Sequence, residues 1–164
     1  MIAALIADPI QALIAEAERY LAERERPPGS NRSTRIDYWL AETGAPLGVP
    51  WCAAFVTAVG RQALGIAWPV PRSAFVQEIV QWAYPKQLVY TEPERGDLLV
   101  IRFPDLGRFA HVGIVTIASP DRITTIEGNT NIDGSREGYG VFARQRSRSP
   151  QYRFVRWAEA VGNT

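Results

Sequence analysis

The spacing of hydrophobic residues changes along this chain of 164 residues, and that change limits the possible fold more than any other feature. In the first half, apolar residues recur at intervals of three and four, which is typical of helices with one face on a core. In the second half, short runs rich in β-branched residues are bounded by turn residues, which is typical of strands. Helices followed by consecutive strands indicate an α+β fold, with N-terminal helices packed on an antiparallel sheet of about five strands.

The first helix is expected within residues 1–25, and Pro, Gly, Ser and Asn residues over 26–34 end it. Further helices are predicted over residues 34–42, 50–64 and 73–82. Pro50 is expected in the first helical turn, where its missing N–H leaves no bond unmade. Strands are predicted over residues 96–103, 111–118, 122–129, 138–147 and 152–160, arranged as a meander.

Composition narrows the function classes. The length fits a single domain, residues 1–164, and 46% of the residues are hydrophobic, as in globular proteins. The net charge of +1 indicates no nucleic-acid or membrane partner, and no segment is long enough to span a membrane. The N-terminus lacks a basic start and Asp8 interrupts its apolar run, so we expect no secretory signal peptide.

The stretch VPWCAAFVTA contains the only cysteine, Cys52, so no internal disulfide can form. Cys52 lies at the predicted start of a helix, where free N–H groups and the helix dipole favour a thiolate over a thiol. It is therefore a candidate nucleophile. A buried cysteine that packs like alanine is an equally good interpretation of this stretch alone.

The only histidine, His111, lies at the start of a predicted strand, and period-two alternation places it on one face with Gly113 and Val115. From there it can act as a general base towards a helix N-terminus, or it is a surface residue at a strand edge. A lone histidine together with a lone cysteine at a helix start is more informative than either residue alone.

The segment EGN, residues 127–129, ends the next predicted strand. Glu127 and Asn129 are two residues apart, so both can point towards His111. Either side chain can accept the second N–H of the imidazole and fix its tautomer. The alternative is a strand end followed by an Asx turn, and Asn131 fits that turn better than a catalytic role.

The remaining polar and aromatic residues say less about function than these candidate catalytic residues. Asp97 is predicted to accept hydrogen bonds in a turn, and Trp51 is a possible cleft wall beside Cys52 that contacts substrate. One histidine and one cysteine cannot complete a structural zinc site, so neither a metal nor a cofactor is expected. Alternating arginines near the C-terminus are predicted to form a solvated face; they are Arg144, Arg146, Arg148, Arg153 and Arg156.

Four segments occur in the order PWCAAFV, GDLLVI, HVGIVT and IEGNTN. Together they resemble the CHAP domain, a cysteine, histidine-dependent amidohydrolase/peptidase related to NlpC-type, papain-like peptidoglycan hydrolases. The resemblance covers nearly the whole chain and implies a papain-like fold. It also implies that Cys52 is the nucleophile, that His111 is the general base, and that Glu127 or Asn129 orients His111.

The resemblance implies cleavage of an amide bond in the stem peptide or cross-bridge of peptidoglycan through an acyl-enzyme, by a phage lysin or an antibacterial effector. Specificity would lie in the segments WPVPRSAF and FPDLGRFA. Some CHAP domains bind calcium through an acidic loop, but Asp37 and Glu42 do not form the dense cluster such a site needs, so no required metal is expected.

On this interpretation the protein is a monomer whose partners are peptidoglycan and a possible immunity protein or delivery partner. It is made in the cytoplasm and acts in the periplasm or cell wall after export by another system. Two alternatives stay open. One is a cytoplasmic amidase for a small γ-glutamyl or polyamine amide, and the other is a catalytically silent wall-binding module.

Overall fold

The strands form a single antiparallel sheet in the computed structural model, which describes residues 8–132 and 138–162. Within those residues the sheet has six strands in the order β1-β6-β2-β3-β4-β5. The strands are β1 (Val89–Tyr90), β2 (Leu98–Phe103), β3 (Arg108–Ala118), β4 (Arg122–Thr130), β5 (Gly140–Ser147) and β6 (Tyr152–Val155). The predicted α+β class is confirmed.

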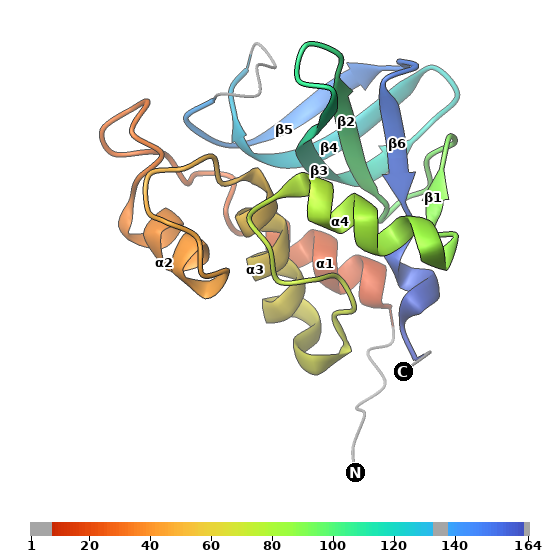
Figure 1. Cartoon of the computed structure of the whole chain (residues 1–164), viewed down its shortest axis with the longest axis horizontal. Coiled ribbons are helices and arrows are strands. Elements are labelled where there is room, and N and C mark those ends of the chain that lie inside the picture. The colour runs from red at the N-terminus through yellow and green to blue at the C-terminus, as the bar shows by residue number, and fades with distance from the viewer. Residues whose placement is uncertain (1–7, 133–137, 163–164) are drawn as a thin grey trace.

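The α-helices are α1 (Pro9–Glu18), α2 (Thr34–Glu42), α3 (Cys52–Leu64) and α4 (Val76–Ala83). Short 3-10 helices follow α3 (Gly65–Ala67), α4 (Tyr84–Lys86) and β6 (Trp157–Ala160). Figure 1 shows the helices gathered below the sheet, with the strands arching above them. Helix α3 contacts β3 and β4 as well as α1 and α2, so it is the central element of the helical layer.

The sequence of α3 explains that central position. Its residues from Cys52 to Gly60 are all buried, and only the last turn reaches solvent. A helix that is apolar on every side must be surrounded by protein. Small residues over most of this stretch allow the neighbouring elements to approach closely, while Phe55 contacts Trp39 and Tyr20 edge-to-face. The helix that begins with Cys52 is therefore fixed along most of its length.

The two faces of the sheet carry different clusters. Val112 and Ile114 of β3 pack into the main core between sheet and helices, whereas Val115 belongs to a smaller cluster on the other face. Because side chains alternate along a strand, His111 and Gly113 lie on the face of Val115. On β4 the same alternation places Glu127 on the face of this smaller cluster.

Two predictions about the strands are wrong. The strands do not follow a simple meander, because β6 pairs with β2 and β1 rather than with β5. The two-residue strand β1 was not predicted, since a pair of residues carries no detectable alternation. The strand predicted over 152–160 ends at Val155, and a 3-10 helix follows over Trp157–Ala160.

The predicted start of the third helix is also wrong by two residues. Pro50 lies before the helix, Trp51 is its N-cap with φ −124° and ψ 13°, and Cys52 is the first helical residue. The predicted helix over 73–82 begins later, at Val76, because Ser73 accepts a hydrogen bond from the N–H of Phe75 and forms a turn there.

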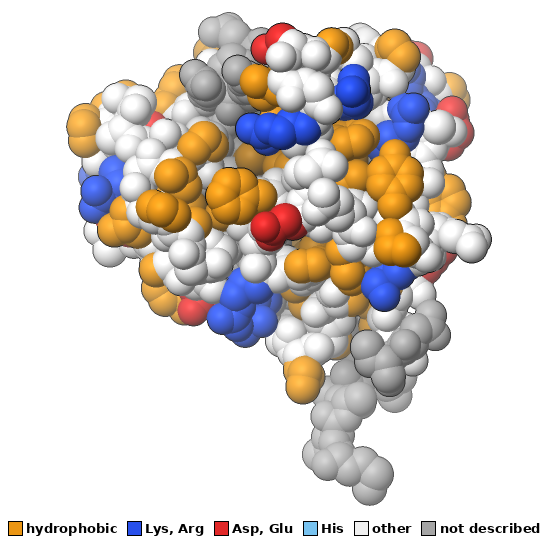
Figure 2. Space-filling model, viewed as in Figure 1, with side chains coloured by type: hydrophobic (Ala, Val, Ile, Leu, Met, Phe, Trp, Pro, Cys, Tyr) orange, Lys and Arg blue, Asp and Glu red, His pale blue; other side chains and the backbone are white. Residues whose placement is uncertain are grey.

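One face of the molecule shows no dominance of one kind of charge (Figure 2). Figure 2 shows basic, acidic and hydrophobic side chains interspersed on the face it presents, in keeping with the net charge of +1. No helix in the described part of the chain is both long enough and apolar enough to cross a membrane.

The close packing of α3 gives a test of the fold. A Cβ atom added at Gly60 would lie 2.2–2.5 Å from the ring of Trp68, which itself packs on Trp157. We expect Gly60→Ala to lower the free energy of unfolding by about 1–3 kcal/mol in urea denaturation, because overpacking outweighs the higher helix propensity of alanine. Arg61→Ala, one residue along at an exposed position, should change it by no more than about 0.5 kcal/mol. Unchanged stability of Gly60→Ala would contradict the packing described here.

Candidate active site

Cys52 is the first residue of α3, and its side chain lies at the edge of a cavity of about 240 Å³. Only 4% of the residue is exposed. The start of α3 has no side-chain cap hydrogen bond, so the N–H groups of the first turn have no capping acceptor. A thiol at this position lies next to free N–H donors and the positive end of the helix dipole, both of which stabilise a thiolate.

His111 on β3 is buried and directed by one hydrogen bond. Its Nε2 lies 2.7 Å from Oε2 of Glu127. Among the described residues, no atom lies in hydrogen-bond geometry to its Nδ1. Because Nε2 is engaged by Glu127, Nδ1 is the nitrogen left for Cys52, whose side chain interacts with the ring and affects its pKa. The structure therefore brings Cys52, His111 and Glu127 together in that order.

Glu127 on β4 is completely buried, and its carboxylate has partners on both oxygens. Oε1 accepts hydrogen bonds from Thr125 Oγ1 at 2.5 Å and from Arg146 Nε at 2.7 Å. Oε2 accepts from Arg146 Nη2 at 2.7 Å besides its bond with His111. Burial alone would raise the pKa of Glu127, but the hydrogen bonds and charges of Arg146 and His111 outweigh it and hold the pKa well below its usual value.

The opposite shift occurs at His111. Burial lowers its pKa, but the charge of Glu127, the interaction with Cys52 and the hydrogen bond with Glu127 outweigh burial and raise the pKa from 6.5 to about 9. The imidazolium form is thus favoured at neutral pH, in contact with an ionised carboxylate on one side and a thiol on the other. This is the charge arrangement that an activated cysteine requires.

The structure separates the two candidates for the third group. Glu127 contacts the imidazole, whereas neither side-chain polar atom of Asn129 has a hydrogen-bond partner among the described residues. Asn129 is 1% exposed and has φ 53°, in the left-handed region. That conformation interrupts the alternation of β4, and so the period-two expectation that Asn129 and Glu127 point the same way does not apply.

Trp51 does not form a cleft wall. Its side chain is completely buried, its Nε1 donates a hydrogen bond to Glu25 Oε1 at 2.9 Å, and its ring packs near Trp39. The prediction that Trp51 lines a cleft and contacts substrate is therefore wrong. Trp51 instead anchors the residue before Cys52 in the core.

Three of the arginines that were predicted to be solvated, Arg146, Arg148 and Arg156, lie in ion pairs, and Arg146 and Arg156 are also mostly buried. The side chain of Arg146 is 11% exposed and binds Glu127. That of Arg156 is 14% exposed and pairs with Asp97 at 3.1 Å. The expected role of Asp97 in a turn is confirmed, because its Oδ2 accepts a hydrogen bond from the N–H of Glu94 at 2.8 Å.

The cavity beside Cys52 has walls from both segments that were predicted to set specificity. Ala74 and Phe75 precede α4 on one side, while Leu106, Arg108 and Ala110 come from the β2–β3 hairpin and the start of β3. The remaining lining residues are Val49, Pro50 and Val76. Arg108 is the only formally charged side chain of this lining in the described structure.

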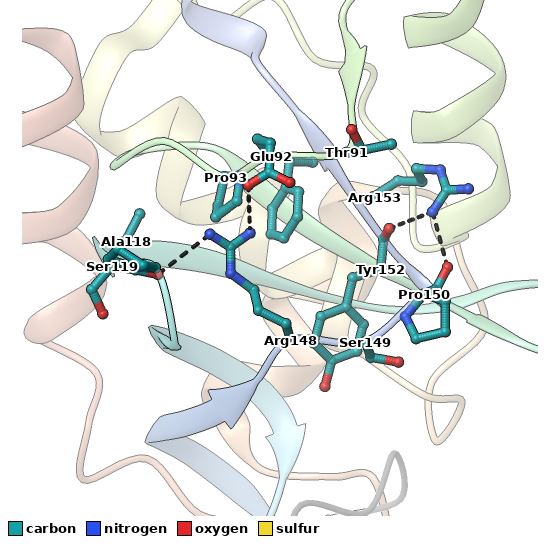
Figure 3. A pocket seen from close by; sticks show the side chains of 12 residues that line it. Thr91, Glu92, Pro93, Ala118, Ser119, Arg148, Ser149, Pro150, Tyr152 and Arg153 are labelled. Carbon is teal, nitrogen blue, oxygen red and sulfur yellow. Dashed lines mark hydrogen bonds and ion pairs between the residues drawn. The ribbon is translucent and has the colours of Figure 1, made fainter.

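A larger hollow, of about 790 Å³, lies elsewhere on the sheet and contains none of the candidate catalytic residues (Figure 3). Both arginines of its lining bind other residues that line the same hollow. Arg148 binds Glu92 and the carbonyl of Ser119, and Arg153 binds the carbonyls of Pro150 and Tyr152. In residues 8–132 and 138–162, no three His, Cys, Asp or Glu side chains are grouped to hold a metal ion.

The pKa of His111 can be measured directly, because it is the only histidine. An NMR titration of the native protein should give a midpoint near pH 9, and the urea-unfolded chain one near 6.5. Since the folded value is the higher one, protonation stabilises the fold below about pH 6.5, and this contribution is lost as the pH rises through 9. Glu127→Gln should lower the midpoint more than Cys52→Ala. A native midpoint at or below 6.5 would contradict the charge arrangement.

A family match covers the segments that contain the candidate catalytic residues. The family model of the CHAP domain matches residues 44–129, more than half of the chain, and includes Cys52, His111, Glu127 and Asn129. The comparison with curated proteins gives no match. Among solved structures, the crystal structure of Ly7917 is similar over 89% of this chain and 61% of that one, with a TM-score of 0.49 and 16% sequence identity. This chain thus spans about three fifths of that protein. The match over residues 44–129 shows that the chain belongs to the CHAP family, the cysteine, histidine-dependent amidohydrolases and peptidases.

Proposed function

We propose that this protein is a peptidoglycan hydrolase that cleaves an amide bond in the stem peptide or cross-bridge through a covalent acyl-enzyme. CHAP domains are amidases or peptidases that commonly act on peptidoglycan. The observation that carries the proposal is the arrangement of Cys52, His111 and Glu127. Cys52 lies at an uncapped helix start beside His111, and Nε2 of His111 binds the buried carboxylate of Glu127. These are the three roles of a cysteine nucleophile, its base and the group that orients the base.

The first half of the proposed reaction forms a thioester. The thiolate sulfur of Cys52 attacks the carbonyl carbon of the scissile amide, and the carbonyl oxygen takes up the negative charge. The C–N bond then breaks as the imidazolium of His111 gives its proton to the leaving nitrogen. The products of this half are a free amine and an acyl group on Cys52.

The second half releases the acyl group. Neutral His111 takes a proton from water, and the resulting hydroxide attacks the thioester carbonyl. The C–S bond breaks, the carboxylic acid leaves, and the thiolate–imidazolium pair forms again. In both halves the N–H of Cys52 at the start of α3 is a candidate donor to the oxyanion, because the first-turn N–H groups have no capping side chain.

The chemistry of the cleft supports a stem peptide as substrate. Its walls are small or aliphatic at most positions, and Arg108 adds one positive charge. Peptidoglycan stem peptides combine alanine with residues that carry free carboxylates. An apolar cleft with one guanidinium matches that combination, since guanidinium and carboxylate form two parallel hydrogen bonds. The proposed site of action is the periplasm or cell wall, where this substrate lies, reached through a delivery partner of a phage or an antibacterial system.

The reaction can be tested on purified sacculi. The wild-type protein should release new amino groups and muropeptides, whereas Cys52→Ala should release none above background. His111→Ala should lower the rate by about 10²–10⁴, because it removes the general base. Thermal unfolding of each variant is the control for folding. Release by Cys52→Ala at the wild-type rate would exclude this mechanism, and mass spectrometry of the fragments identifies the bond that is cut.

The role of Arg108 is tested with pairs of synthetic peptides that differ only in a carboxylate or carboxamide next to the scissile amide. We expect the wild-type protein to prefer the carboxylate by about tenfold or more in kcat/KM, and Arg108→Gln to lose that preference. Arg102→Gln is the matched control, because Arg102 is exposed on the neighbouring strand and does not line the cleft. An unchanged preference in Arg108→Gln would exclude this contact.

A further inference from the structure

Arg146 is the one arginine whose side chain reaches the proposed catalytic residues in the described structure. It lies on β5, on the far side of β4 from β3 and His111. Its Nε and Nη2 each lie 2.7 Å from a different oxygen of Glu127, so the guanidinium and carboxylate bind in the bidentate manner. With 11% of the Arg146 side chain and none of Glu127 exposed, the ion pair is shielded from water and salt.

The charges of this cluster balance only when Arg146 is present. In the thiolate form the cluster contains Cys52 and Glu127 as anions and His111 and Arg146 as cations, with a net charge of zero. Without Arg146 the same form carries a net charge of −1 in a buried site. A buried net charge is costly, and the protein relieves it by binding a proton. The thiol of Cys52 is the group that takes this proton, because Glu127 and the imidazolium remain paired with each other.

We propose that Arg146 is a positioning residue of the active site, which holds Glu127 ionised against His111 and thereby maintains the thiolate of Cys52. The inference rests on the roles proposed above for Cys52 and His111. It adds a fourth member to the site, one that acts through Glu127 and does not contact the substrate. Its effect should appear in the ionisation of the thiol as well as in turnover.

Few other ionisable groups act on this cluster. The phenol of Tyr152 on β6 interacts with Arg146. Burial lowers the pKa of the Arg146 guanidinium, but the interactions with Glu127 and Tyr152 outweigh burial and raise it. Thr125 binds Glu127 but does not titrate. Arg146 is thus the cation that balances Glu127 when His111 is neutral.

The ionisation of Cys52 can be followed without a substrate, because it is the only cysteine. The rate of alkylation by iodoacetamide as a function of pH reports the thiolate, and absorbance near 240 nm reports it independently. In Arg146→Met we expect the midpoint to rise by about one pH unit or more, which lowers the alkylation rate about tenfold at pH values below the wild-type midpoint. Turnover of sacculi should fall by at least the same factor.

Two further variants separate charge from geometry. Arg146→Lys keeps the charge but not the two parallel hydrogen bonds, so the alkylation midpoint should recover more fully than kcat. Arg146→Ala enlarges a hollow of about 170 Å³ that is lined by His111, Arg146 and Tyr152. Methylguanidinium at millimolar concentration should therefore restore part of the alkylation rate of Arg146→Ala, whereas sodium chloride at the same concentration should not.

Arg144→Met is the matched control. Arg144 lies two residues from Arg146 on β5, but its guanidinium binds the carbonyl of Asn131. We expect its alkylation profile to equal that of the wild-type protein. If Arg146→Met is less stable but has the wild-type alkylation midpoint, Arg146 is only structural and the inference is wrong. If the wild-type protein cleaves no peptidoglycan while Arg146→Met still shifts the midpoint, the proposed function fails and the inference stands.

Discussion

A carboxylate without access to water depends on its hydrogen bonds, and Glu127 has four of them from three side chains. Each donor comes from the sheet, on β3, β4 or β5, so the position of Glu127 requires the register of all three strands. Gly113 is part of the same requirement, because a Cβ atom there would lie 2.5 Å from Cγ of Glu127. The site is therefore a property of the assembled sheet. Removal of one partner would leave a buried group unsatisfied, which costs more than the bond itself contributes.

The helical layer supplies the other half of the site in a different way. Helix α3 is held by apolar contacts along nearly its whole length, and its buried N-cap Trp51 is tied to Glu25. Nonpolar packing thus fixes where the helix begins, while the first-turn N–H groups are left without a capping side chain. Most helices gain stability from such a cap. Here the uncapped start places donors and a favourable dipole beside Cys52, and the core compensates for the missing cap.

The fold class and the pairing of Cys52 with His111 were predictable, because each rests on local patterns: hydrophobic period, turn residues and two residue types that occur once. The role of Arg146 was not predictable in this way. It lies in an alternating run of arginines, and the strand register pairs it with Ile123, so only the side-chain hydrogen bonds show that its guanidinium reaches Glu127. Trp51 was mispredicted as a cleft wall, because a residue before a helix can point into the core. The alternation used to place Asn129 beside Glu127 does not apply, because Asn129 has a left-handed backbone conformation. The strand β1 was missed because it has only two residues.

The turn between β2 and β3 supplies residues that line the cleft, but it lies outside the part of β3 that carries His111. Leu106 and Arg108 line the cleft, while His111 lies three residues further along a strand that is paired on both sides. Hydrogen bonds within the turn, from the N–H groups of Leu106 and Gly107, close it on itself. Insertions or deletions over residues 104–107 would thus reshape one wall of the cleft without shifting the register that holds the charged cluster. The substrate preference of related chains can therefore diverge through a turn of four residues, while the reactive centre stays the same.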